Sequence, residues 1–425
     1  MNKNKAWWLL SVFLLVLVSA PFWISEEEDL EELETKKQIE IKGSRITGYQ
    51  KGKLNWSVYA DYVWTGRSKF IFRAEKVLDG QLYDSDGQLI VDHIKADRIR
   101  VNSKSKTLSA YDQIEATFQK REVKVNKGLR ASEKKKKKIN ITADELRYFS
   151  LSKRTYLYKN VKIKQKDAIV YPSKGVEVDN DNNIAYIDGG FLMKSDEFVV
   201  SGNQMTIYID DDYSEMSGDI TAIRIGKPTT NITLDQRERD MRGEDVVLTC
   251  DYLKYSDKDN QKVIEINGNI HIQQAEKQLR GEKGYYNQEK NIYRVDGNVQ
   301  FLSDSLGFLL DKNRKATFEN PDMSKAIQQR VTVNANQFLF EPDQKKLELM
   351  GNVRVDQVDK KIKAKKIQFL DEKNKLILKG NVEIIKDDQD TISCEFLEID
   401  INSESFYAGE SVQTEFKVKK NKDKP

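Results

Sequence analysis

The feature that most constrains this chain is a repeat of 29 residues, clearest in the copies that start at Ala335 and Ala364 (364 minus 335). In each copy a small residue and a polar residue precede an aromatic residue, a turn and a Gly-Asn-Val step. Further copies start near Ala143, Lys174, Gly202, Cys250, Gly281, Leu306 and Cys394. A unit this short cannot bury its own apolar face, so the copies must stack on one another.

Within a copy the apolar residues alternate with polar ones. Val353 and Val355 flank Arg354, and a period of two places them on one face of a strand with Arg354 on the other. Turn-forming residues such as those at 179–183 follow at hairpin spacing. The pattern therefore predicts two antiparallel strands in each copy and an all-β chain.

The Gly-Asn steps, such as Gly351-Asn352 and Gly380-Asn381, predict a kink at the same place in every copy, because glycine tolerates backbone conformations that other residues avoid. Kinked copies would stack into V-shaped antiparallel sheets that enclose a trough. Apolar residues of the inward phase would line it, although plain core packing explains such residues equally well. The candidate lining residues are Trp56, Val58, Tyr148, Ile163, Val353, Val355, Val382 and Ile384.

The amino terminus predicts one transmembrane helix. Residues 6–24 are apolar-rich and would span roughly 28 Å as a helix, enough for one bilayer crossing. Lys3 and Lys5 precede this span and acidic residues follow it, which places the amino terminus in the cytoplasm and the rest outside. Residues 18–20 also resemble a signal-peptide cleavage site, but Pro21 disfavours cleavage there because it lacks a backbone N–H.

Composition changes along the chain predict its domain organisation. Residues 126–138 hold five consecutive lysines and form a natural linker between two β regions. The predicted segments are a tip and anchor (1–25), an acidic linker (26–38), a first β domain (39–125), the lysine-rich linker (126–138), β repeats (139–225), an insertion (226–243), further β repeats (244–418) and a basic tail (419–425).

The composition argues against several kinds of function. The 71 Lys and Arg residues nearly balance 68 Asp and Glu residues, so no broad basic face for nucleic acid is expected. His93, His271, Cys250 and Cys394 are too scattered for the usual metal-ligand spacings. Each cysteine stands where other copies carry a small residue and is expected to be buried, although a disulfide between them stays open. We expect no catalytic residues, no metal and no cofactor.

The order of these features resembles the lipopolysaccharide-transport proteins of the cell envelope. The anchor with residues 56–61, 82–87 and 96–97 resembles LptC, and the copies at 141–161 and 335–385 resemble LptA and the OstA-like domain. The resemblance implies an elongated β-jellyroll, the β-taco, whose apolar groove shields acyl chains. It also implies head-to-tail strand pairing with neighbours. The fusion of both parts in one chain and the insertion at 226–243 depart from the family pattern.

From the resemblance we expect a periplasmic bridge component, anchored by a single pass in the inner membrane, that passes lipopolysaccharide or a related glycolipid toward the outer membrane. Its partners would be the permeases of an inner-membrane ABC transporter and an LptA-like bridge or LptD-like outer-membrane receiver. Edge strands at residues 39–42 and 406–418 would dock them. The alternatives are a structural or adhesive envelope protein without lipid cargo, since stacked repeats also form inert rods, and an enzyme built on the repeats.

Overall fold

The computed structural model describes residues 37–120, 138–165, 167–227, 239, 243–258, 261–306, 325, 327–386, 390–401, 403 and 405–415. These residues form two compact units. Unit 1 holds the described residues of Met1–Val123 and Asn140–Tyr158, and unit 2 holds those of Lys124–Ile139 and Lys159–Pro425. Residues 140–158 were expected to open the second β region, but they pack within unit 1, so the unit boundary differs from the predicted domain boundary.

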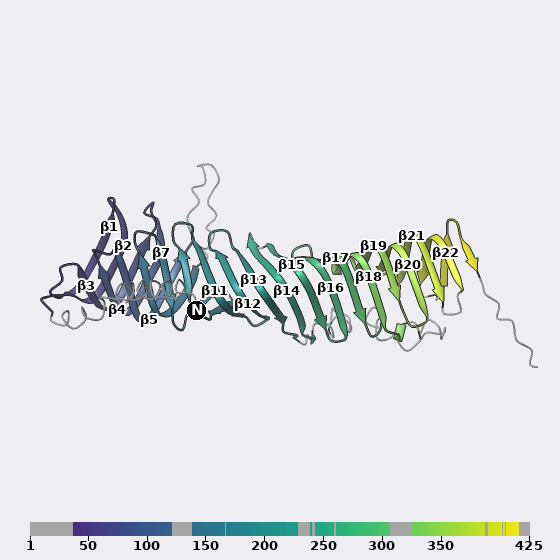
Figure 1. Cartoon of the computed structure of the whole chain (residues 1–425), viewed down its shortest axis with the longest axis horizontal. Helices are drawn as coiled ribbons and strands as arrows, with labels where there is room; N and C mark the ends of the chain where they lie inside the picture. The colour runs from purple at the N-terminus through teal and green to yellow at the C-terminus, as the bar shows by residue number, and fades with distance from the viewer. Residues whose placement is uncertain are drawn as a thin grey trace, which may run out of the picture. The chain divides into compact units, whose positions relative to one another are not determined.

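Unit 1 is built from antiparallel strands (Figure 1). Strands β1 to β5 each pair with the next one along the chain, and β6 forms a hairpin with β7. The strands are β1 (Ile39–Gln50), β2 (Lys53–Thr65), β3 (Ile71–Tyr83), β4 (Leu89–Asn102), β5 (Thr107–Gln119), β6 (Lys138–Phe149) and β7 (Arg154–Tyr158). The sharp turn between β3 and β4 contains Gly87, as the run of turn residues at 84–87 predicts.

Unit 2 is a longer antiparallel array. It begins with three short strands, β8 (Lys162–Gln165), β9 (Ala168–Pro172) and β10 (Val176–Asp179), and both β9 and β10 pair with β11. From β11 to β22 every strand pairs with its successor. This order confirms the prediction of an all-β chain with two antiparallel strands per copy.

The long strands of unit 2 are similar in length, and most follow one another through short turns; the longer connecting stretches are residues 225–245 and 304–330. They are β11 (Ile184–Lys194), β12 (Phe198–Tyr208), β13 (Tyr213–Arg224), β14 (Val246–Lys258), β15 (Gln261–Gln274), β16 (Lys277–Asn287), β17 (Ile292–Ser303), β18 (Val331–Glu341), β19 (Lys346–Asp356), β20 (Lys360–Leu370), β21 (Lys375–Lys386) and β22 (Thr391–Asp400). The 3-10 turn η2 (Pro342–Gln344) joins β18 to β19, and β22 pairs with two short final strands, β23 (Ser405–Gly409) and β24 (Gln413–Glu415).

The Gly-Asn steps are β-bulges, which confirms the predicted kink. In β19, Gly351 and Asn352 have φ of +78° and +50° and face the single residue Asn336 of β18, so β19 carries one extra residue. The same pair of left-handed residues occurs in β15, β17 and β21, and the register shifts there as well. A bulge bends its strand, so a bulge repeated at one level of every second strand creases the whole array.

The antiparallel array continues across the predicted insertion at 226–243. Strand β13 pairs directly with β14 from Tyr213↔Ser256 to Arg224↔Val246. The copy predicted near Leu306 lies largely outside the described residues. The described strands resume at Val331, which pairs with Ser303 of β17.

The predicted transmembrane span, residues 6–24, lies outside the described residues. Among those that are described, no helix has the length and apolar character needed to cross a membrane.

Candidate functional site

A row of buried residues follows the crease of unit 2 on its inner face, and it alternates between large and small side chains. Directly after each bulge stands a branched residue, such as Val353 of β19 or Val382 of β21, which is 1% exposed. Each pairs with a small residue of the next strand, Ala364 or Cys394, each 5% exposed. The alternation lets the inner faces on either side of the crease approach closely, because bulky side chains interdigitate with small ones. We call this line of residues the crease row.

In three of the hairpins the acidic residue after the small residue, Asp251, Glu282 or Glu395, accepts a hydrogen bond from the asparagine of the neighbouring bulge on the opposite side. Asp251, which follows Cys250, accepts a hydrogen bond of 2.9 Å from the side-chain amide of Asn269. In the next hairpin, Glu282 accepts one of 2.5 Å from Asn298. The recurring small-polar pair thus has two roles, with the small residue inside the crease and the polar residue against the bulge outside it.

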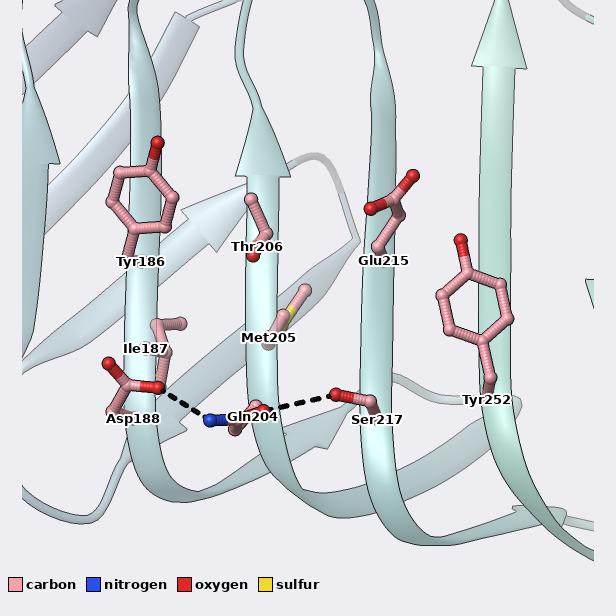
Figure 2. A pocket seen from close by; sticks show the side chains of 9 residues that line it. All are labelled: Tyr186, Ile187, Asp188, Gln204, Met205, Thr206, Glu215, Ser217 and Tyr252. Atoms are coloured by element: carbon pink, nitrogen blue, oxygen red, sulfur yellow. Dashed lines mark hydrogen bonds between the residues drawn. The ribbon is translucent and has the colours of Figure 1, made fainter.

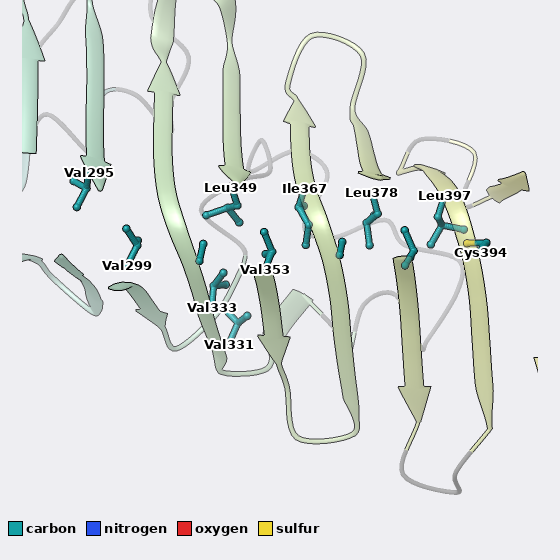
Figure 3. Packing of buried hydrophobic residues seen from close by; sticks show 13 residues of the cluster. Val295, Val299, Val331, Val333, Leu349, Val353, Ile367, Leu378, Cys394 and Leu397 are labelled. Atoms are coloured by element: carbon teal, nitrogen blue, oxygen red, sulfur yellow. The ribbon is translucent and has the colours of Figure 1, made fainter. Parts of the chain in front are cut away.

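The inner faces on either side of the crease converge into one hydrophobic cluster (Figure 3). Leu349, Ile367 and Leu378 lie on one side of the crease, and Val353 lies on the other side. Their side chains form a line that runs across the strands from Val295 to Leu397. Burial of this line supplies the main stabilisation of the array, because apolar area removed from water is worth about 25 cal/mol per Å².

Farther from the crease, the inner face carries an uninterrupted row of apolar residues that stays half-buried. Cross-strand pairing links one residue from each strand between β14 and β22. The row comprises Leu248, Ile272, Leu279, Phe301, Val333, Val355, Ile362, Ile384 and Ile392. Only Val333 is buried, and the others keep part of their surface exposed. We call this line the open apolar row.

The other arm of the inner face has a matching line at its rim. It comprises Tyr255, Ile264, Tyr286, Tyr293, Phe340, Leu347, Phe369, Leu376 and Ile399. The rings of Tyr286 and Tyr293 stack at 4.5 Å, and Tyr293 is 40% exposed. We call this line the aromatic row. Two apolar lines therefore border the buried crease row along nine strands, and all of their residues except Val333 and Phe369 keep part of their surface exposed.

The outer face of the same strands is charged. Arg354 is exposed and lies opposite Lys363, which in turn forms an ion pair of 2.7 Å with Glu383. Lys346 and Lys366 contact the Glu348 carboxylate at 3.0 and 2.9 Å. Burial would raise the pKa of Glu348, but the hydrogen bonds from Lys366 and Lys346 outweigh it and hold that pKa below its ordinary value. The two faces of unit 2 thus differ sharply in polarity.

Four of the predicted lining residues lie on this inner face. Val353 and Val382 belong to the crease row and have no appreciable exposed surface. Val355 and Ile384 belong to the open apolar row and remain half-buried, and both pack against the core cluster. Only the second pair offers surface that a ligand could contact without movement of the strands.

The remaining predicted residues are spread over both units. In unit 1, Val58 is 1% exposed and Tyr148 is fully buried, and the Tyr148 hydroxyl donates a 2.8 Å hydrogen bond to Asn55. Trp56 is half-buried, and its ring lies over Gly48 of β1. In unit 2, Ile163 of β8 is 1% exposed. These residues fill cores, and Tyr148 closes a buried polar cluster with Asn55 and Lys153.

Sequence reasoning missed most of the open apolar row, including Ile272, Leu279 and Phe301. The signal was available, because each lies two residues from a crease-row position and therefore on the same face of its strand. Phe301, for example, follows Val299 by two. Counting in twos from each Gly-Asn step would have found Ile272 and Phe301, and counting from the small residue Gly281 would have found Leu279.

The described residues contain one cluster with spacing suited to a cation, formed by Asp79, Asp92 and His93 in unit 1. Its carboxylates already have protein partners. Arg45 lies 3.4 Å from Asp79, and Gln119 donates a 2.9 Å hydrogen bond to Asp92. Cys250 and Cys394 are both buried free thiols, as expected for small core residues, and burial raises the pKa of Cys250 to about 11.

Fold and site together define a class, an antiparallel β-repeat protein with one charged face and one apolar face that is open at its rims. One family model matches part of the chain. Residues 248–405, less than half of the chain, match the family described as "LptA/(LptD N-terminal domain) LPS transport protein". The match covers both half-exposed rows almost completely. It does not extend to residues 39–125, whose likeness to LptC stays a prediction.

No curated protein matches the chain. Among the solved structures, a match is found to LptH, described as the LptA homologous periplasmic component of the conserved lipopolysaccharide transport device from Pseudomonas aeruginosa. The two chains are 13% identical, the match covers 41% of this chain and 95% of that one, and the TM-score is 0.19. At this score the likeness carries no structural argument.

Proposed function

We propose that this protein is a periplasmic bridge component that binds the acyl chains of lipopolysaccharide, or of a related glycolipid, on the inner face of unit 2 and passes the lipid toward the outer membrane. The observation that carries the proposal is the open apolar row, which runs over nine consecutive strands within the segment that matches the LPS transport family and is half-buried at every position except the buried Val333. Monomeric proteins rarely leave a continuous apolar strip of this extent without a ligand.

Acyl binding needs no chemistry from the protein. An acyl chain laid along the open apolar row gains about 25 cal/mol for each Å² of its surface that leaves water, while the glycolipid headgroup remains in solvent. Neighbouring residues of the row are about 4.8 Å apart, so a chain that lies across the strands meets the same apolar environment at each step. The lipid can therefore slide without a large barrier, and we propose no catalytic role.

The proposal places the chain at the inner membrane. Residues 6–24 would anchor it, with Lys3 and Lys5 in the cytoplasm and both β units in the periplasm. Amino-terminal sequencing of the mature protein tests this part. An intact amino terminus supports the anchor, and a start at Pro21 would make the protein a soluble carrier instead.

Strand edges would pass the lipid between proteins. At the amino-terminal edge, Ile39 and Ile41 of β1 are 59% and 52% exposed, and they would meet the periplasmic domain of an ABC transporter. At the other edge, Phe406 and Tyr407 of β23 are both 66% exposed and would meet an LptA-like bridge or an LptD-like receiver. Free main-chain groups at an edge strand give affinity through strand addition. A proline at Glu415 should then abolish partner crosslinking without unfolding the strands upstream.

Co-isolation of lipid with purified protein tests the central proposal. Ile384 and Ile385 are adjacent isoleucines of β21 with similar burial, but Ile384 lies in the open apolar row and Ile385 pairs with Lys361 on the outer face. The substitution Ile384→Lys should remove most of the bound glycolipid, whereas Ile385→Lys should leave it. Protein that never co-isolates with a lipid A-type glycolipid, or equal loss in both variants, would favour a structural envelope protein.

A further inference from the structure

A shallow depression lies on the outer face of unit 2, away from the apolar rows (Figure 2). Its walls are Tyr186 of β11 at one end and Glu215 and Tyr252 at the other, and the short side chain of Thr206 lies between them. Cross-strand pairing places Tyr186, Thr206 and Glu215 at one level of three successive strands. The depression is therefore about 10 Å wide from the strand of Tyr186 to that of Glu215, since neighbouring strands are about 4.8 Å apart.

One edge of the depression is a ladder of polar side chains. The Gln204 amide donates a 3.1 Å hydrogen bond to Asp188, and the Ser217 hydroxyl donates one of 3.3 Å to Gln204. The ladder fixes the amide of Gln204, so its orientation does not have to be set again when a ligand binds. A fixed polar group costs little conformational entropy on binding.

The opposite wall is a carboxylate surrounded by phenols. The Tyr208 hydroxyl donates a 3.3 Å hydrogen bond to Glu215, and the Tyr208 ring stacks on Tyr213 at 4.1 Å. Burial, together with the neighbouring Glu215 carboxylate, raises the pKa of Tyr208 and of Tyr252 to about 12. Both phenols therefore stay protonated at neutral pH, and their hydroxyls hold the Glu215 carboxylate in place.

The chemistry of the lining narrows the ligand class. Two carboxylates, Asp188 and Glu215, disfavour an anion, and the alternation of hydroxyl, amide and carboxylate groups disfavours an acyl chain. Sugar hydroxyls both donate and accept hydrogen bonds, as Ser and Thr hydroxyls do, which suits this mixed lining. The rings of Tyr186 and Tyr252 offer apolar surface for the carbon framework of a sugar at the two ends.

We infer that this depression is a binding site for a neutral saccharide ring, on the face of unit 2 opposite the apolar rows. Carboxylate and amide groups accept and donate hydrogen bonds to the sugar hydroxyls, and a tyrosine ring at each end of the depression offers apolar surface to the sugar. The inference does not rest on lipid binding, because the site and the open apolar row share no residue. The saccharide could come from a glycolipid headgroup or from the glycan strands of the cell wall, which present the same chemistry.

Two lipid-free probes separate these sources in a titration of the full chain by calorimetry or saturation-transfer NMR. One is the dephosphorylated oligosaccharide released from lipopolysaccharide, and the other is a trimer of N-acetylglucosamine. Binding of either probe supports the site and identifies its source. Failure of both probes overturns the inference while leaving the acyl-binding proposal untouched.

Matched variants locate the binding. Thr206→Tyr fills the depression and should weaken binding by about tenfold or more, whereas Gln368→Tyr places the same ring at the same outer-face level of β20 and should change affinity by less than about twofold. Glu215→Gln keeps the shape and should weaken binding severalfold. Equal affinities in Thr206→Tyr and the unaltered protein would overturn the inference.

Discussion

Units 1 and 2 are both built from antiparallel strands of alternating apolar and polar residues, yet they bury very different shares of them. Strand β4 of unit 1 and strand β15 of unit 2 each have 14 residues, of which seven are buried in β4 and two in β15. In unit 2 the crease row is buried, and the rows beside it stay half-exposed. Similar patterns thus give a filled core in one unit and an apolar surface that is open at its rims in the other, which is the property a lipid carrier needs.

The largest expected effect comes from truncating one phenylalanine in each unit. Phe118 of unit 1 is fully buried, and Phe301 of unit 2 is half-buried in the open apolar row. Phe118→Ala should lower the free energy of unfolding by about 3–5 kcal/mol, and Phe301→Ala by about half of that or less, because it leaves no closed cavity. Hydrogen exchange in peptides of each unit measures both losses. Equal losses would mean that the inner face of unit 2 is as closed as the core of unit 1.

A smaller effect separates the glycines of the two units. Gly351 has φ +78°, and a Cβ there would come within 2.6 to 2.9 Å of the Asn336 side chain, whereas Gly87 has φ +81° and open space around it. Gly87→Ala should cost about 1 kcal/mol from backbone strain alone, and Gly351→Ala about 1–3 kcal/mol because the neighbouring strand must also move. Urea denaturation of the two variants gives both values. If Gly351→Ala lowered the free energy of unfolding by less than Gly87→Ala does, the bulge would not be the origin of the crease.

The ion pairs predict that a buried pair of unit 2 and an exposed pair of unit 1 contribute differently to stability, and that the contribution of the buried pair is lost at acidic pH. Glu348 is 5% exposed between two lysines, and its folded pKa lies below the ordinary value of 4.5. Its ionised form therefore stabilises unit 2 above about pH 4.5, and this contribution is lost as the pH falls from 4.5 through the lower folded pKa. Glu348→Gln should cost about 1 kcal/mol at neutral pH.

The control for this prediction is the exposed pair between Arg98 and Asp112 of unit 1, at 2.6 Å. Asp112→Asn should cost less than about 0.5 kcal/mol, since water screens exposed pairs. Thermal unfolding at pH 7 and pH 3 measures the comparison. The assigned role of Glu348 would be refuted if Glu348→Gln lowered the unfolding temperature by the same amount at pH 7 and at pH 3.

The smallest effect is expected at the two cysteines of the crease row. Cys250 and Cys394 occupy positions that other strands fill with Ala335 and Ala364, and all four are 4% to 6% exposed. Replacement of either cysteine by alanine should change the free energy of unfolding by less than about 1 kcal/mol. The raised pKa of Cys250 should also make its alkylation slow until the protein unfolds. Rapid labelling of native protein would show that the crease opens.

The sequence was sufficient to predict the strands, the kinks at the Gly-Asn steps and the buried cysteines, because each depends on local chemistry. The period of two gives the faces of each strand, and the positive φ at Gly351 and Asn352 follows from residue types that tolerate it. The pairing of β13 with β14 across the insertion was not predictable, because it depends on which strands meet in space. For the same reason the local pattern could not assign residues 140–158 to unit 1.

The candidate site was only partly predictable. Alternation identified the face of Val353 and Val355, but it could not tell that the first is sealed in the crease and the second is half-exposed. That distinction depends on how far each residue lies from the crease and on which side chains of the other side of the crease cover it, and both follow from the three-dimensional packing of the strands. The depression beside Thr206 was missed entirely, because its residues come from four strands and share no sequence pattern.

Photo-crosslinking in cells tests most directly the claim that the open apolar row carries lipid. Crosslinkers placed one at a time at Val355 and Ile384 in this row, and at Arg354 and Glu383 in the opposite phase of the same strands, sample both faces at matched depth. The account predicts that lipopolysaccharide is captured at Val355 and Ile384 and is absent at Arg354 and Glu383. Equal capture on both faces, or none on either, would contradict it.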